Sequence, residues 1–151
     1  MGIEKRLFGT LPSGEGVEEF SITNSRGVRV GVITYGGILK EIAVPDRNGE
    51  RADVVLGFNS IEEYLSDHPF FGVTVGRVAG RITGGSFFLD REKYQLEIND
   101  PPNHLHGGSN GFDKQLWLGE VESDDTVVLN YVSPDGENGY LVDPKDVPGT
   151  A

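Results

Sequence analysis

Hydrophobic and polar residues alternate over short runs along most of the chain, and glycine, proline and asparagine separate these runs. Alternation with a period of two is typical of β-strands that bury one face. The pattern predicts antiparallel strands at 17–24, 28–35, 38–45 and 52–58, a hairpin over 86–99 that turns near Asp90 and Arg91, and a strand at 126–132. The chain is therefore predicted to be an all-β protein.

One segment has a helical pattern instead. Residues 60–68 place Ile61, Tyr64 and Leu65 on one face, and Ser60 with Glu63 three residues later matches a capping box. We expect one short helix near residues 60–66. Residues 141–151 contain two prolines and a glycine without strand alternation, so they are predicted to form an irregular tail.

Composition and charge narrow the range of partners. The 151 residues suit one domain, and 13 basic against 24 acidic residues give a net charge of -11, which repels nucleic acids and anionic membranes. No run approaches the roughly 20 apolar residues that span a bilayer. With no cysteine, disulfides and thiolate zinc sites are excluded. We expect a soluble, cytoplasmic protein that binds neither nucleic acid nor membrane.

The glycine-rich segment 76–85, "GRVAGRITGG", carries Arg77 and Arg81 four residues apart. Glycines beside an arginine suggest a phosphate-binding loop, but the residue order of a P-loop is missing. The alternative is a strand and turn in which one arginine pairs with a surface carboxylate. From the residues alone, this second interpretation is favoured because most charged side chains are solvated.

Residues 101–117, "PPNHLHGGSNGFDKQLW", contain two histidines. If the segment is extended, His104 and His106 project to the same face, which suits a metal ion held by two imidazoles. A third ligand would have to come from His68 or Asp113.

The glycines that follow His106 suggest two other interpretations. Gly107 and Gly108 allow positive φ or a close backbone approach, which would place His106 at the edge of a concavity as a hydrogen-bond or proton donor. A structural hydrogen bond between the imidazole and the backbone is the third alternative. Spacing alone favours the structural turn and leaves the other two open.

The remaining candidates are a turn and several aromatic residues. The composition of 133–140, "SPDGENGY", suits a tight bend and does not match a calcium loop. Core positions are expected for Phe71, Phe112, Trp117 and Tyr140, although an exposed ring could stack on the apolar face of a sugar.

Five stretches together resemble the aldose 1-epimerase family, also called galactose mutarotases. They occur in the family's order and spacing over about residues 5–140: "LPSGEGVEEFSITN", "DVVLGFNSIEEYL", "FFGVTVGRVAGRI", "NHLHGGSNGFDKQLW" and "SPDGENGY". The resemblance implies an antiparallel β-sandwich of the galactose mutarotase type, a supersandwich. Family members are roughly twice as long, so the resemblance implies a truncated, N-terminal half.

The resemblance also implies an activity: cofactor-free interconversion of the α and β anomers of free hexoses such as galactose and glucose. His106 matches a pocket histidine that hydrogen-bonds the sugar near its ring oxygen, and it is the one catalytic candidate. Arg81 matches the substrate-binding arginine. Gly80 stands where the family often has asparagine, so altered sugar contacts are expected. His104 matches a variable position, and no metal is implied.

Three groups of the family's site have no match in these residues: the proton-donating histidine, an aspartate that binds substrate and the glutamate base. We therefore expect residues 1–140 to form the N-terminal part of a mutarotase-like domain, followed by the tail at 141–151. Activity of this chain alone is expected to be low. A dimer, or a complex with a complementing C-terminal half, is expected because half a sandwich exposes apolar faces and strand edges. The alternatives are a non-catalytic sugar-binding module and a metal-binding β protein.

Overall fold

The computed structural model describes residues 2–141, so nearly all of the predicted tail lies outside the described residues. Contacts divide the chain into two compact units. We call Met1–Thr74 with Asp113–Tyr131 the sheet unit, and Val75–Phe112 with Val132–Ala151 the loop unit. Each is described below by itself.

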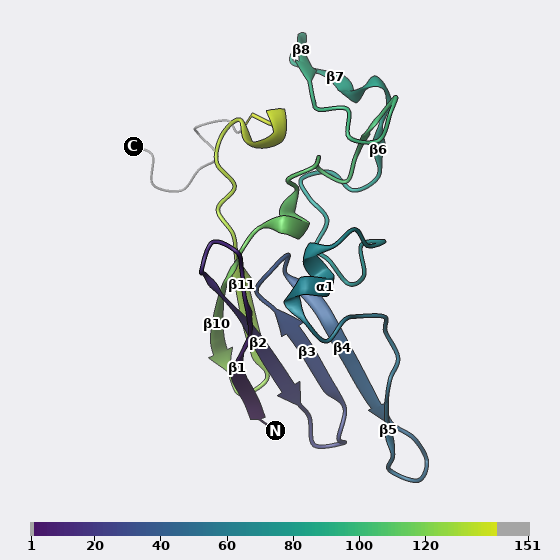
Figure 1. The fold of residues 1–151 in the computed structure, drawn as a ribbon, viewed down its shortest axis with the longest axis vertical. Coiled ribbons are helices and arrows are strands. Elements are labelled where there is room, and N and C mark those ends of the chain that lie inside the picture. The colour runs from purple at the N-terminus through teal and green to yellow at the C-terminus, as the bar shows by residue number, and fades with distance from the viewer. Residues whose placement is uncertain (1, 142–151) are drawn as a thin grey trace. The chain divides into compact units, whose positions relative to one another are not determined.

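The sheet unit contains a five-stranded antiparallel sheet in which every strand pairs with its neighbours in sequence (Figure 1). Its strands are β1 (Gly2–Thr10), β2 (Gly16–Thr23), β3 (Arg29–Ile33), β4 (Ile38–Pro45) and β5 (Arg51–Asp53). The four strands predicted from alternation are confirmed, but β5 ends early. It ends because the Asp53 carboxylate accepts hydrogen bonds from the backbone N–H groups of Ile42 and Val55, at 3.0 and 3.1 Å.

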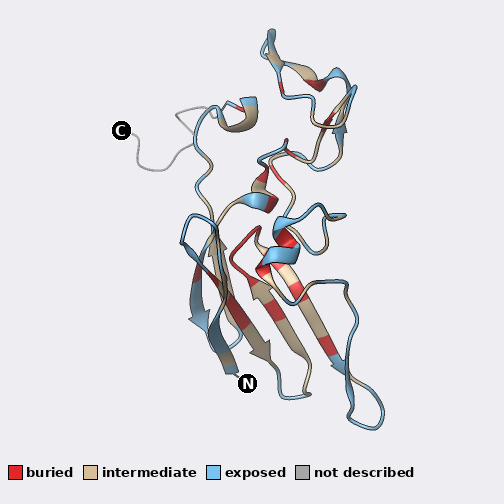
Figure 2. Ribbon diagram, viewed as in Figure 1, coloured by how far each residue is buried: buried red, intermediate tan, exposed pale blue. Residues whose placement is uncertain are grey.

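One face of this sheet packs under the predicted helix, which is α1 (Ile61–Leu65). The side-chain oxygen of Ser60 caps the helix by accepting a hydrogen bond from the N–H of Glu63. Gly9 of β1 allows the close approach, since a Cβ there would lie 2.6 Å from Cγ2 of Ile61. The core beneath the helix consists of Val17, Ile33, Tyr35, Ile38, Ile61 and Tyr64. Figure 2 shows these buried positions along the central strands and the helix.

A hairpin packs on the opposite face at Phe20. It consists of β10 (Leu118–Ser123) and β11 (Thr126–Asn130), and only β11 was expected from alternation. A Cβ at Gly119 would overlap the Phe20 ring, so glycine lets β10 approach this face. The N–H of Trp117 donates to the carbonyl of Thr34 at 2.8 Å, which ties the start of the hairpin to the end of β3.

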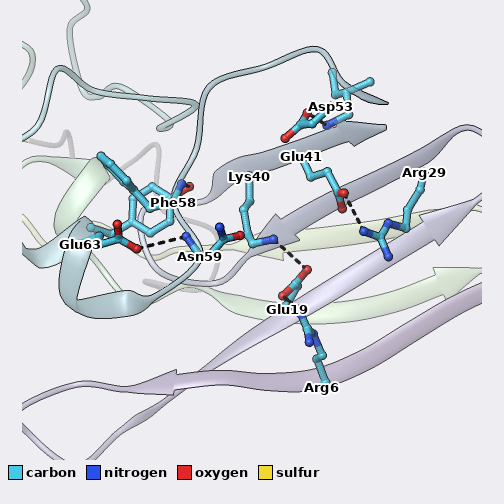
Figure 3. Close-up of polar contacts among 11 residues, drawn as sticks. Arg6, Glu19, Arg29, Lys40, Glu41, Asp53, Phe58, Asn59 and Glu63 are labelled. Atoms are coloured by element: carbon cyan, nitrogen blue, oxygen red, sulfur yellow. Dashed lines mark hydrogen bonds and ion pairs between the residues drawn. The ribbon is translucent and has the colours of Figure 1, made fainter. Parts of the chain in front are cut away.

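On the face of the sheet that packs against α1, a buried carboxylate forms ion pairs with side chains of two other strands (Figure 3). Glu19 is 2% exposed and contacts Nη2 of Arg6 at 2.7 Å and Nζ of Lys40 at 3.5 Å. Gly31 lies between these strands, where a Cβ would lie 3.5 Å from Oε1 of Glu19. The contact between Glu19 of β2 and Lys40 of β4 therefore passes over Gly31 of β3 and spans two strand spacings.

The loop unit contains short elements. They are β6 (Arg81–Ile82), η1 (Thr83–Gly85), β7 (Ser86–Leu89), β8 (Glu92–Gln95), β9 (His104–Leu105) and η3 (Glu137–Gly139). The 3-10 helix η2 (Phe112–Lys114) has its first residue in the loop unit and its other two residues in the sheet unit. Strands β7 and β8 form the predicted hairpin, and its turn residues Asp90 and Arg91 both have positive φ, 50° and 70°.

All strand pairs in the described residues are antiparallel, and α1 is their single α-helix. The all-β prediction is confirmed. Strand β1 was not predicted, because its sequence does not alternate strictly and most of its residues are exposed. It forms a strand by pairing with β2. Within residues 2–141, no helix has the length and apolar character required to cross a membrane.

Candidate functional site

Two sequence motifs meet in the loop unit. In the antiparallel pair β6–β9, Arg81 is opposite Leu105, and Ile82 is opposite His104. The N–H of His106 continues this pairing by donating to the carbonyl of Gly80 at 3.0 Å. The structure therefore brings together the three candidate residues Gly80, Arg81 and His106.

His106 leaves the extended conformation of β9. Its φ is 52°, and Gly107 and Gly108 follow with φ of 90° and 100°. The positive φ expected of these glycines is confirmed. A Cβ at Gly107 would overlap the carbonyl oxygen of Gly76, so the close approach seen at this position is to the chain's own backbone. The half-buried His106 ring accepts a hydrogen bond at Nδ1 from the N–H of Gly80, at 3.1 Å.

The prediction that His104 and His106 project to one face is wrong, because β9 ends at Leu105 and His106 turns into the left-handed region. His104 is fully buried. Its Nδ1 lies 2.8 Å from the carbonyl oxygen of Glu97, and its Nε2 lies 2.8 Å from the Tyr140 hydroxyl.

Both nitrogens of His104 are thus used by protein groups, which contradicts the two-histidine metal pair. Residues 2–141 contain no cluster of three or more metal-binding side chains. The candidate third ligands, His68 and Asp113, belong to the sheet unit. The structural alternative for His106, a hydrogen bond between its imidazole and the backbone, is confirmed by the contact with Gly80, and His104 has structural hydrogen bonds as well.

Arg81 forms an ion pair with Asp100, with 2.6 Å between Nε and Oδ2, and its side chain is 58% exposed. The interpretation that one arginine of the glycine-rich segment pairs with a surface carboxylate is confirmed. Asp100 is itself held by two backbone hydrogen bonds with Asn103, at 3.0 and 2.7 Å. Asp100 was not predicted, because it lies in no recognisable motif.

The loop that follows His106 is held by side chains from two other segments. Ser109 donates to the carboxylate of Glu97 from its N–H at 2.9 Å and from its hydroxyl at 2.8 Å. Asn138 donates to the carbonyl of Asn110 at 2.7 Å. Glu97 and Asn138 were not predicted to hold this loop, because their partners Ser109 and Asn110 are distant in sequence.

The other arginine of the motif, Arg77, has a structural role. Its Nε donates to the hydroxyl of Ser133 at 2.9 Å, and its Nη2 donates to the carbonyl of Pro134 at 2.9 Å. These bonds hold the turn 133–140, whose predicted bend is confirmed by φ of 80° at Gly136. Burial raises the pKa of Tyr140, and the charge of Arg77 opposes this in part.

Gly80 has φ of 90°, and a Cβ built there would have nothing within 4 Å. The space beside the backbone of Gly80 is therefore open, next to Arg81 and close to His106. Among the aromatics expected in the core, Tyr140 is buried and Phe112 packs against Gly76. In the sheet unit, the half-buried Trp117 ring lies 5.7 Å from that of Tyr131.

Comparison with known proteins identifies the family. The family model for aldose 1-epimerases matches residues 18–144. The chain belongs to the aldose 1-epimerase family. Galactose mutarotase from Sus scrofa is 48% identical over 141 residues, and that from Homo sapiens is 47% identical over 139 residues.

A solved family structure, galactose 1-epimerase from Lactobacillus acidophilus NCFM, superposes with a TM-score of 0.78 at 32% identity. This match covers 93% of the chain and 41% of that structure, and the Sus scrofa match has the same coverage. The chain therefore has the antiparallel β-sandwich fold of its family and spans about two fifths of these relatives' length. The sugar-binding roles of Gly80, Arg81 and His106 stay predictions.

Proposed function

We propose that this chain supplies part of the sugar site of an aldose 1-epimerase, which interconverts the α and β anomers of free hexoses such as galactose and glucose without a cofactor. The pairing of β6 with β9 carries this proposal. It brings a guanidinium, Arg81, and an imidazole, His106, from segments that are distant in sequence to adjacent positions.

Each group has a chemistry that suits a sugar. The guanidinium of Arg81 keeps N–H donors beyond the Nε bound to Asp100, and a fork of donors can bind two neighbouring sugar oxygens. His106 offers a hydrogen bond to the ring oxygen, which must gain a proton when the ring opens. Gly80 leaves open space beside its backbone, where the family often has an asparagine side chain.

We propose that residues 1–151 alone catalyse this reaction poorly. Ring opening requires a base at the anomeric hydroxyl and an acid at the ring oxygen, and neither the family's glutamate base nor its proton-donating histidine has a match among these residues. The chain spans 41% of the Sus scrofa relative. Polarimetry of α-D-galactose with the purified chain tests this point, and turnover comparable to that of a full-length relative would overturn it.

Sugar binding is tested separately by calorimetric titration with galactose. We expect weak binding that is abolished by His106→Ala and by Arg81→Gln. Arg47→Gln is the matched control, because Arg47 is exposed in the turn between β4 and β5. Binding that is undetectable at millimolar galactose, or unchanged by the two site variants, would contradict the proposal.

We also propose that residues 1–140 form the N-terminal part of a mutarotase-like domain. A complementing C-terminal half, or a second copy of the chain, would cover the exposed apolar face of its sheet. The second face of the sheet supports this, since its apolar side chains remain half-buried beside the hairpin: Ile22, Val30, Val32, Leu39 and Ile42. Size-exclusion chromatography should show association or aggregation, and a stable monomer would contradict it.

Adding a polypeptide that corresponds to the rest of a relative should restore mutarotation. If that polypeptide binds the chain and galactose still binds, but mutarotation does not appear, the alternative of a non-catalytic sugar-binding module would replace the enzymatic proposal.

A further inference from the structure

We propose that the backbone amide of Gly80 is a positioning group that sets the tautomer of His106, so that Nε2 carries the proton of the neutral ring. The same unit holds His104 in the opposite tautomer. The assignment of sugar as the ligand of His106 rests on the proposed function, whereas the tautomers follow from hydrogen bonds within the chain.

The tautomer of His106 follows from its hydrogen-bond partner, the backbone N–H of Gly80. The Gly80 N–H can only donate, and it lies 3.1 Å from Nδ1 of His106. Nδ1 must therefore present its lone pair. A neutral imidazole has one protonated nitrogen, so the proton is on Nε2.

The opposite holds for His104. The carbonyl oxygen of Glu97 can only accept, and it lies 2.8 Å from Nδ1 of His104, so that nitrogen carries the proton. Nε2 then accepts from the Tyr140 hydroxyl at 2.8 Å. Two histidines separated by one residue are thus assigned different tautomers by a backbone donor and a backbone acceptor.

The Gly80 contact is reciprocal, which makes it specific. The Gly80 carbonyl accepts from the N–H of His106 at 3.0 Å, while the Gly80 N–H donates to the ring of the same residue. This arrangement requires φ of 90° at Gly80 and 52° at His106. Glycine adopts such a φ at little cost, so Gly80 suits the position through its backbone.

The tautomer determines what His106 can do. Its Nε2 donates a hydrogen bond to a ring or hydroxyl oxygen and cannot remove a proton there while the ring is neutral. Nδ1 is occupied by the Gly80 amide, so protonating the ring would break that hydrogen bond. His106 therefore acts as a donor, and the base for ring opening must be another group.

Nuclear magnetic resonance on the full chain, with ¹⁵N-labelled histidine and backbone, tests the tautomers without sugar. In spectra where both rings are in the neutral form, we expect a proton on Nε2 of His106 and on Nδ1 of His104. A scalar coupling across the hydrogen bond should join the Gly80 amide nitrogen to Nδ1 of His106. A proton on Nδ1 of His106, or no coupling from Gly80, would overturn the proposal.

A backbone ester at Gly80, made by incorporating glycolate, removes the N–H and adds no side chain. We expect the ¹⁵N shifts of His106 to change, those of His104 to stay, and galactose affinity to fall roughly twofold to tenfold, as for one hydrogen bond. Gly80→Ala keeps the amide and has open space for its methyl group, but φ of 90° strains alanine, so it should retain the tautomer with lower stability of the chain. Unchanged His106 shifts in the ester would contradict the proposal. If the unaltered chain fails to bind galactose while its tautomers are as assigned, the proposed function fails and the tautomer assignment stands.

Discussion

The sheet unit and the loop unit hold their chains in place by different means. Among residues 2–141, ten hydrophobic residues are buried; eight belong to the sheet unit, and Leu96 and Tyr140 belong to the loop unit. The loop unit instead buries His104 and several glycines. Its segments are joined by hydrogen bonds that the side chains of Arg77 and Asn138 donate and that the carboxylate of Glu97 accepts.

The apolar core that stabilises the fold and the candidate site thus lie in different units. Apolar burial is non-directional, so a sheet tolerates small shifts of its side chains, whereas a hydrogen bond requires its donor and acceptor at a defined distance and angle. The candidate site lies in the unit whose structure depends on such geometry. Substitutions in the two units should therefore differ in their cost to stability.

The largest effect is expected in the core of the sheet unit. Ile33 is fully buried between the sheet and α1, so Ile33→Ala should lower the free energy of unfolding by about 4 kcal/mol through lost burial and a cavity. Leu118→Ala, at a side chain that is 62% exposed, is the control and should cost less than about 0.5 kcal/mol. Urea denaturation measures both, and similar losses would refute the contrast.

In the loop unit, the largest effect is expected where two backbones touch. Gly107→Ala should cost about 3 kcal/mol, because its Cβ would overlap the Gly76 carbonyl. Gly136→Ala is a matched control with φ of 80° and open space around its Cβ. It should lower the free energy of unfolding by about 1 kcal/mol, the cost of a positive φ for alanine. Equal losses for the two variants would mean that backbone proximity is unimportant at Gly107.

Removing a carboxylate charge should have different effects in the two units. Glu19→Gln leaves the buried Lys40 without its counter-charge and should cost about 2 kcal/mol. Asp100→Asn removes the partner of the exposed Arg81 and should cost less than about 1 kcal/mol. Chemical denaturation at low and high salt compares them, and a larger loss for Asp100→Asn would reverse the predicted order.

The buried hydrogen bond between Tyr140 and His104 should contribute about 1 kcal/mol. Tyr140→Phe keeps the ring but leaves Nε2 of His104 without its donor. Hydrogen exchange should become faster in residues 104–111. Tyr94→Phe, at an exposed hydrogen bond to Glu92, serves as the control. If exchange in that segment is unchanged, His104 does not hold the loop through Tyr140.

The smallest effect at neutral pH concerns three tyrosines. Burial raises the pKa of Tyr35 and Tyr64 in the sheet unit and of Tyr140 in the loop unit above the ordinary value of 10.0, and the charge of Asp113 adds to the effect at Tyr35. Their contribution to stability is fully present below pH 10.0 and is lost as pH rises through the folded-state pKa values.

Stability should therefore fall in alkali, and the fall should be less steep in Tyr35→Phe. Phenolate absorbance, compared between the folded chain and the chain in urea, measures the titration. Identical titration curves in the two states would contradict the predicted shifts.

Much of the fold could be predicted from local patterns. Alternation located β2, β3 and β4, and Ser60 with Glu63 located α1, because these signals depend on neighbouring residues. Strands β1 and β10 were missed, since their residues become a strand through pairing with distant segments. Strand β5 was predicted too long because the Asp53 carboxylate replaces a ladder contact.

The candidate site was predicted in part. Resemblance to a family selected His106, Arg81 and Gly80, and the run of two glycines after His106 indicated positive φ. The same spacing suggested a metal pair that the structure contradicts, because one histidine leaves the strand. Asp100 and Glu97 could not be found, since neither lies in a motif and each acts on a residue that folding brings near.

Strand periodicity, the helix cap and the glycines that permit a left-handed turn follow from the order of the amino acids, because they depend on residues a few positions apart. Which nitrogen of each histidine meets a donor and which meets an acceptor depends on the folded chain. Those partners, Gly80 for His106 and Glu97 and Tyr140 for His104, are 7 to 36 residues away, and hydrogen-bond direction depends on where the folded backbone places them.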